Sequence, residues 1–255
     1  PDALNKKSTL IVTVGAIQSN HARQTAAVCA KLGIKCLIIL EQRLKKAPEV
    51  YSKSGNVFLN KLFGAEIIFC PIEENIENFA NEIMKKRMTI GERPYFIPVG
   101  GSNEIGELGY VECMREILQD KKQHNFTHIV LASGSGGTHS GTVVGATYFK
   151  SNINIIGISV KDKKLNQEEK VFKLAKNCCD YIQSNYPKRE DIIVFDDYVG
   201  KGYGIPTEGM KEAVELMAKK EAILLDPVYS GKSFNGLIDL IKKKHFKNTD
   251  KILFI

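Results

Sequence analysis

The sequence of 255 residues lacks several features that would place it in other classes of protein. No apolar run approaches the roughly 18 residues of a membrane span, and the first residues, PDALNKKS, lack the apolar core of a signal peptide. The six cysteines form no CxxC pair and stand mostly inside apolar runs. This pattern predicts reduced, buried thiols and disfavours a zinc site. We therefore expect a cytoplasmic protein that binds neither metal nor membrane.

Basic stretches interleaved with aromatic residues are also missing. The chain carries 36 Lys and Arg against 29 Asp and Glu, a formal net charge of +7, but its lysines are scattered along predicted helical faces. A nucleic-acid interface normally gathers its positive charge with stacking side chains. We expect a solvated basic surface and a small-molecule partner, with no nucleic acid bound.

Short apolar runs alternate with helix-period segments along the whole chain. Residues 75–87, for example, place Ile76, Phe79 and Ile83 on one helical face. Such alternation predicts an α/β fold of two parallel-sheet, three-layer domains. The polar segment 119–125 is the expected boundary, which gives a smaller domain over 8–120 and part of a larger one over 121–255. The expected strands lie near 9–14, 35–40, 66–69, 95–97, 128–132, 154–159, 192–195 and 251–255.

The segment LASGSGGTHSG, residues 131–141, has the composition of a phosphate-binding turn. It follows one expected strand and opens an expected helix over 138–149. Glycines there let backbone amides converge on an anion at a helix N-terminus, and hydroxyls add further donors. The turn matches neither GxxxxGK[ST] nor a complete dinucleotide fingerprint. The candidate phosphate ligands are Ser133, Gly134, Ser135, Gly136, Gly137 and Thr138.

Polar residues also follow the first expected strand. Gln18, Ser19 and Asn20 precede a predicted helix over 21–32, where they can cap the helix or help to receive a carboxylate. His21 on its first turn, like His139 in the phosphate turn, suits either packing or chemistry. Ligands of such folds bind at the carboxyl ends of strands. We therefore take Gln18, Ser19 and His21 as candidate substrate-binding residues.

Two later segments carry aromatic hydroxyls on flexible backbone. Tyr203 lies between two glycines, and Tyr229 and Ser230 precede a predicted helix over 232–244. Taken alone, each segment is equally well explained as a surface loop or a turn with a cap. Together with the phosphate turn and the carboxylate-binding turn, they describe a pocket for a flat phosphorylated cofactor and an amino acid. Pyridoxal 5'-phosphate is such a cofactor.

Five motifs, in order, resemble those of one family of fold type II, tryptophan-synthase-β-like, pyridoxal-phosphate enzymes. This family contains D-cysteine desulfhydrase and 1-aminocyclopropane-1-carboxylate deaminase, and the resemblance spans essentially the whole chain. The motifs are QSNHARQTAA, PVGGSNEIGELGYVEC, GSGGTHSG, GYGIP and DPVYSGKS. The resemblance implies the fold, the cofactor and a homodimer.

The resemblance also implies roles for individual residues. Residues 134–138 would bind the cofactor phosphate, and Asn20 would bind the pyridoxal 3-oxygen. Ser19 would meet the substrate carboxylate or move a proton, and Ser230 would bind the pyridine nitrogen. Tyr203 would approach the substrate amine, while Tyr229 would lie against the ring or assist proton transfer. The implied catalytic residues are Ser19, Tyr203 and Tyr229.

One departure from the family concerns its Schiff-base lysine. That lysine lies in a GNK-type motif upstream of the first strand, and Lys6 and Lys7 stand in NKKST without the glycine. The family's HTGG-type turn, expected after the last strand, would lie beyond Ile255. We therefore expect a chain truncated at both ends, with the Schiff-base lysine outside it.

Within the family, the residue at the position of Ser230 helps to select the reaction. The resemblance implies glutamate there in the cyclopropane-carboxylate deaminases, and serine or threonine in the desulfhydrases. A neutral hydroxyl makes a weaker electron sink, sufficient for β-elimination. The expected activity is D-cysteine desulfhydrase, a lyase that forms pyruvate, sulfide and ammonia. The alternatives are 1-aminocyclopropane-1-carboxylate deaminase, a sulfonate lyase of the same family, a catalytically dead homologue that keeps only the ligand pocket, and a nucleotide-binding α/β protein.

Overall fold

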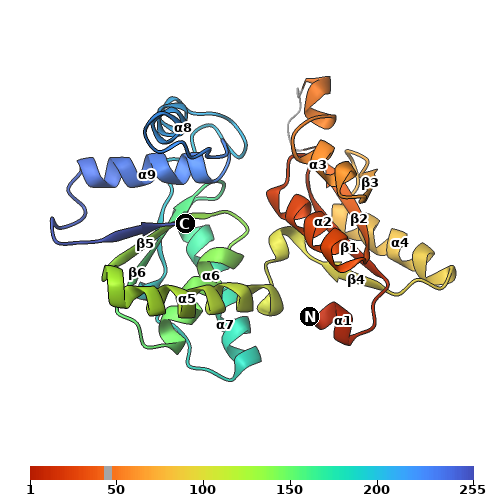
Figure 1. The fold of residues 1–255 in the computed structure, drawn as a ribbon, viewed down its shortest axis with the longest axis horizontal. Coiled ribbons are helices and arrows are strands. Elements are labelled where there is room, and N and C mark those ends of the chain that lie inside the picture. Colours follow the sequence, from red (N-terminus) through yellow and green to blue (C-terminus); the bar gives the residue numbers. More distant parts are fainter. Residues whose placement is uncertain (43–47) are drawn as a thin grey trace. The chain divides into compact units, whose positions relative to one another are not determined.

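The computed structural model describes residues 1–42 and 48–255, leaving aside the side chains of residues 121–123. The chain divides into two compact units, Pro1–Gly101 and Ser102–Ile255. Each unit contains one four-stranded sheet in which every neighbouring pair of strands is parallel (Figure 1). The expected fold of two parallel-sheet α/β units is confirmed.

In the first unit the strand order is β3-β2-β1-β4. Helices α2 and α3 cover one face around Ile11 and Ile38, and α4 covers the other around Val12 and Leu37. The elements are α1 (Asp2–Asn5), β1 (Leu10–Ala16), α2 (Asn20–Leu32), β2 (Lys35–Glu41), η1 (Glu49–Ser52), α3 (Asn56–Leu62), β3 (Glu66–Phe69), α4 (Ile76–Thr89), β4 (Pro94–Ile97) and η2 (Val99–Gly101).

The second unit repeats this plan with the order β7-β6-β5-β8. Helices α5, α6 and α7 cover the face that carries Ile129 and Leu131, while α9 covers the face that carries Val130 and Ile156. The elements are α5 (Glu104–His124), β5 (His128–Ser133), α6 (Gly137–Tyr148), β6 (Asn154–Ser159), α7 (Lys164–Ile182), η3 (Arg189–Asp191), β7 (Ile193–Phe195), α8 (Glu208–Glu221), α9 (Ser230–Lys242) and β8 (Ile252–Phe254).

The central strands are apolar on successive residues because both faces of each sheet are covered. Every residue of β1 is buried, as are the central five of β2. All eight expected strands are present at their expected places. All six cysteines are free, and five are buried. No helix among the described residues combines the length and the apolar character needed to cross a bilayer.

The division between the units differs from the expected boundary at 119–125. Residues 119–124 form the last turns of α5, and the chain passes between the units at Gly101 and Ser102. The physical reason is that α5 buries Met114 and Ile117 in the core of the second unit. Near its end, Gln119, Asp120 and His124 are exposed and polar, and such a stretch has the composition of a linker.

Candidate active site

The topology places the candidate residues beside the switch point of each sheet. In the first unit, β2 and β3 lie on one side of β1, and β4 lies on its other side. In the second unit, β6 and β7 lie on one side of β5, and β8 lies on its other side. Open parallel sheets bind ligands at the carboxyl ends of strands next to such a reversal. Residues 18–21 follow β1, and residues 134–138 follow β5.

The turn after β5 is shaped for an anion. Helix α6 begins at Gly137, and its N-cap residue is Gly136, which has a left-handed φ of 101° and no side chain to accept from the first-turn amides. Ser102 Oγ accepts from Gly137 N at 3.2 Å. The amides of a helix's first turn need acceptors from outside the helix, and phosphate oxygens suit this need.

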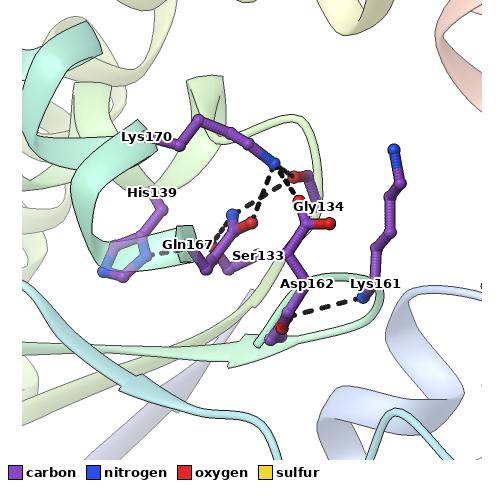
Figure 2. Close-up of polar contacts among 8 residues, drawn as sticks. Ser133, Gly134, His139, Lys161, Asp162, Gln167 and Lys170 are labelled. Atoms are coloured by element: carbon purple, nitrogen blue, oxygen red, sulfur yellow. Dashed lines mark hydrogen bonds and ion pairs between the residues drawn. The ribbon is translucent and has the colours of Figure 1, made fainter. Parts of the chain in front are cut away.

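A buried polar network supports this turn from α7 (Figure 2). Gln167 Nε2 donates to Ser133 Oγ at 2.8 Å and to the Gly134 carbonyl at 3.1 Å. Lys170 Nζ also donates to the Gly134 carbonyl, at 3.3 Å, and forms an ion pair with Asp162. Three donor bonds therefore fix the backbone and side chain of the residues that enter the phosphate turn.

His139 belongs to the same network rather than to the ligand side of the turn. It is fully buried, and its Nδ1 lies 3.1 Å from Ser133 Oγ. Burial lowers the pKa of His139 to about 4, so the ring is neutral at physiological pH. Because Gln167 donates to Ser133, the Ser133 hydroxyl proton is left to point at Nδ1. Ser133 and His139 thus hold the turn in place.

Two tyrosines meet beside the phosphate turn. The phenolic oxygens of Tyr203 and Tyr229 lie 2.6 Å apart. The ring of Tyr229 packs so closely on Gly134 that a Cβ there would lie 3.0 Å from Tyr229 Cε1. The structure therefore brings three predicted segments together within the second unit, namely the phosphate turn, the GYGIP loop and the DPVYSGKS motif.

Ser230 opens α9 and is bonded to Asp226 in both directions. Asp226 N donates to Ser230 Oγ at 2.8 Å, and Ser230 Oγ donates to Asp226 Oδ2 at 2.7 Å. The same carboxylate accepts from the amides of Val228, Tyr229 and Ser230 at 2.9–3.0 Å. Asp226 thereby orders the start of α9 and orients both Tyr229 and Ser230.

In the first unit, Ser19 is the N-cap of α2, and its Oγ accepts from Ala22 N at 3.2 Å. Its hydroxyl proton is still available to a ligand carboxylate. Asn20 follows, and its Oδ1 accepts from Asn56 Nδ2 at 2.8 Å. This bond defines the orientation of the Asn20 amide, so that Nδ2 is the atom left to donate to a ligand oxygen.

Gln18 links the β1 turn to the segment before α3. Its Oε1 accepts from Asn56 N at 2.8 Å, and its Nε2 donates to the Ser54 carbonyl at 3.0 Å. A Cβ on Gly55 would lie 2.6 Å from Gln18 Oε1, so the bond requires a glycine there. Because its amide is used within the protein, we assign Gln18 to orienting Asn56 and, through it, Asn20.

His21 is tied to the underlying sheet. Thr13 Oγ1 donates to the Ile97 carbonyl at 3.0 Å, so it accepts from His21 Nε2, which lies 2.8 Å away. Burial lowers the pKa of His21 to about 4. The ring is therefore a neutral Nε2–H tautomer whose Nδ1 side faces Gly101. Such a ring can accept a hydrogen bond, but it supplies no positive charge for a carboxylate.

Four residues that position the site were missed in the sequence: Asn56, Gln167, Lys170 and Asp226. Asp226 stands in a DP turn before a helix, which is a detectable capping signal. Gln167 and Lys170 lie 33 and 36 residues after Gly134, which they support, on an ordinary amphipathic helix. Among the described residues, no cluster of His, Cys, Asp and Glu is arranged to hold a metal ion.

The fold is therefore an α/β fold whose first unit carries a polar turn after β1 and whose second unit carries an anion-binding turn after β5. Residues 3–255 match the family model of pyridoxal-phosphate dependent enzymes. The chain is similar to the crystal structure of an ACC deaminase homologue, with 34% identity and a TM-score of 0.88; the match covers 100% of this chain and 75% of the other.

Two further solved structures share the fold. A hydrogen sulfide-producing enzyme from Fusobacterium nucleatum has 17% identity and a TM-score of 0.64, with 99% of this chain and 80% of that one covered. A serine racemase from Dictyostelium discoideum has the same identity and TM-score, with 98% and 76% covered. The chain belongs to the pyridoxal-phosphate dependent enzyme family, and its cofactor is pyridoxal 5'-phosphate.

The residues present fit this cofactor. The N-cap Gly136 has no capping side chain, and Ser102 Oγ accepts from the Gly137 amide, so a phosphate would meet the other amides at the start of α6. In the first unit, Asn20 Nδ2 is a donor whose orientation is fixed by Asn56, and in the second unit the Ser230 hydroxyl is held by Asp226. Each unit by itself therefore carries polar groups of a kind that suits this cofactor.

Proposed function

We propose that the protein is a lyase that converts D-cysteine and water to pyruvate, hydrogen sulfide and ammonia. The observation that carries this proposal is Ser230 at the first position of α9, where a hydroxyl and not a carboxyl is presented. The presence of a hydrogen sulfide-producing enzyme among the proteins of this fold agrees with it.

The argument from Ser230 concerns the ring nitrogen. A carboxyl at this position would keep a proton on that nitrogen and strengthen the electron sink, as opening a cyclopropane ring requires. The Ser230 side chain has no carboxyl group that could keep a proton on the ring nitrogen. The Asp226 carboxylate behind it already accepts from three backbone amides and from Ser230 itself. The site thus suits loss of a good β-leaving group, and a thiol is such a group.

The remaining residues bind and orient. When bound, the cofactor supplies an electron sink for the bond that breaks at the substrate α-carbon. The amides of residues 134–138 hold the phosphate, and Asn20 Nδ2 donates to the 3-oxygen. The Ser19 hydroxyl donates to the substrate carboxylate. Tyr203 and Tyr229, one of whose hydroxyls donates to the other across 2.6 Å, hold or move a proton at their phenolic oxygens.

A second candidate activity is 1-aminocyclopropane-1-carboxylate deamination. The 34% identity to an ACC deaminase homologue favours it. The same binding residues would serve both reactions, so Ser230 is the feature that separates them. We further propose a cytoplasmic homodimer. We also propose that the lysine carrying the cofactor lies outside these residues, since none of them matches the family's GNK-type motif.

The test begins with the visible absorbance spectrum of the purified full-length gene product, before and after borohydride, followed by peptide mapping of the reduced cofactor adduct. We expect a yellow protein whose adduct maps to a lysine upstream of Pro1. Sulfide release from D-cysteine and ammonia release from the cyclopropane acid are then compared. Faster ammonia release would favour the deaminase. Bound cofactor without either activity would indicate a catalytically dead homologue, and a protein that binds no cofactor would overturn the proposal.

A further inference from the structure

The largest fully buried side chains include a lysine that no role above uses. Lys232 stands on the first turn of α9, two residues after Ser230, and is 0% exposed. Its Nζ donates to the carbonyl of Val199 at 2.7 Å and to that of Gly202 at 3.0 Å. Burying an ammonium group is costly unless acceptors replace its water. Here both acceptors are backbone carbonyls of one loop.

That loop, residues 198–204, is the one that carries Tyr203. Three of its glycines have left-handed φ values, namely 68° at Gly200, 146° at Gly202 and 72° at Gly204. A backbone so rich in glycine loses much conformational freedom when it is ordered. The loop therefore needs strong bonds to hold one shape, and charge-assisted hydrogen bonds are the strong class.

The two carbonyls that accept from Lys232, those of Val199 and Gly202, lie on either side of residues 200–201 of the loop. One acceptor is next to Tyr198, whose hydroxyl donates to Asp239 Oδ2 at 2.7 Å, farther along α9. The other acceptor, Gly202, immediately precedes Tyr203. Tyr203 in turn meets Tyr229, the N-cap residue of the same helix. A single cation therefore links the backbone beside Tyr203 to the helix that presents Tyr229.

We propose that Lys232 is a positioning residue that clamps the 198–204 loop to α9 and so sets the Tyr203 hydroxyl against Tyr229. The catalytic consequence rests on the proposed function, whereas the clamp itself does not. Burial lowers the pKa of Lys232, as is expected of an amine held away from solvent.

The clamp is tested first without a substrate. In the full-length holoenzyme, 3-fluorotyrosine is placed at position 203 and its fluorine resonance is recorded. We expect one sharp resonance in the wild type, and a shifted or broadened resonance in Lys232→Met, because the loop gains alternative conformations. Lys201→Met is the matched control, since Lys201 is an exposed lysine of the same loop, and it should leave the resonance unchanged.

A second measurement requires no variant, which matters if Lys232→Met does not fold. Brief acetylation of the native protein, followed by peptide mass spectrometry, should label Lys201 and leave Lys232 unreacted. Equal labelling of the two lysines would overturn the clamp. So would an unchanged fluorine resonance in a folded Lys232→Met protein, or a cofactor adduct that maps to Lys232.

The catalytic consequence is tested with a double-mutant cycle on sulfide release from D-cysteine. Lys232→Met is expected to lower kcat/KM about 100-fold, the cost of a displaced reacting group, and to have little further effect when Tyr203 is already Phe. If the fold-losses in kcat/KM of the two single variants multiply in the double variant, Lys232 does not act through Tyr203. A wild-type enzyme that binds the cofactor but releases no sulfide would contradict the proposed function, and the clamp would then be judged from the two earlier measurements.

Discussion

Asp226 and Ser230 exchange two hydrogen bonds across one turn of chain, so the Ser230 hydroxyl is both an acceptor and a donor before any ligand arrives. To donate to an unprotonated ring nitrogen, the Ser230 hydroxyl proton has to turn away from Asp226 Oδ2, which keeps the Ser230 amide as its partner. Asp226 thus competes with a ring nitrogen for the Ser230 proton.

The first prediction concerns substrate choice. Ser230→Glu is expected to raise the ratio of ammonia release from the cyclopropane acid to sulfide release from D-cysteine by about tenfold, or ~1.4 kcal/mol. The reason is that a carboxyl in place of the hydroxyl favours a protonated ring nitrogen. Both rates are measured on the full-length enzyme. Ser230→Thr is the matched control, because it keeps the hydroxyl and should keep the ratio. An unchanged ratio in the Glu variant would refute the argument from the ring nitrogen.

The second prediction concerns support of the phosphate turn. Lys170→Met should weaken cofactor binding by about tenfold, since it removes a charge-assisted bond to the Gly134 carbonyl and leaves Asp162 without its ion-pair partner. Titration of cofactor-free protein with pyridoxal phosphate, followed by absorbance, measures this. Lys173→Met changes an exposed lysine of the same helix and should bind the cofactor normally. Equal affinity of the two variants would show that Lys170 does not support the turn.

The fold could be predicted from the sequence because both faces of each sheet are covered. Each strand is then a short, nearly continuous apolar run between polar segments, and all eight runs are distinct. The boundary could not be predicted in the same way. Gln119, Asp120 and His124 are polar and exposed near the end of α5, while the division at Gly101 falls inside one of the motifs that resemble the family.

Topology alone points to a candidate site residue only where that residue follows a strand, whereas Tyr203, Tyr229 and Ser230 were singled out by their motifs. The segments 18–21 and 134–138 are adjacent to strand ends in sequence, so topology alone places them. Gln167, Lys170 and Lys232 act through bonds to backbone carbonyls of distant loops. A carbonyl has no sequence signal, because every residue has one. Such positioning contacts are therefore visible only once the chain is folded.

The third prediction concerns His21. Its lowered pKa of about 4 implies a neutral ring with the proton on Nε2, bonded to Thr13. Since the folded pKa lies below the ordinary value of 6.5, the unfolded chain binds more protons between these values, and His21 adds stability as the pH rises through that window. Nitrogen-15 correlation spectra should show one Nε2–H tautomer for His21 at all pH values above about 5. A titration midpoint near the ordinary histidine value would contradict this assignment.

The fourth prediction concerns Glu107, which is fully buried on α5 beside Ser140 and Cys178. Burial raises its pKa from 4.5 to about 7. The folded protein therefore binds more protons than the unfolded chain between these values, and the contribution of Glu107 to stability is lost as the pH rises through about 7. The Glu107→Gln variant cannot titrate there. Relative to the wild type it should gain about 3 kcal/mol in free energy of unfolding between about pH 4.5 and pH 8. Urea denaturation at several pH values measures the difference, and parallel curves for the two proteins would show that Glu107 does not titrate in this range.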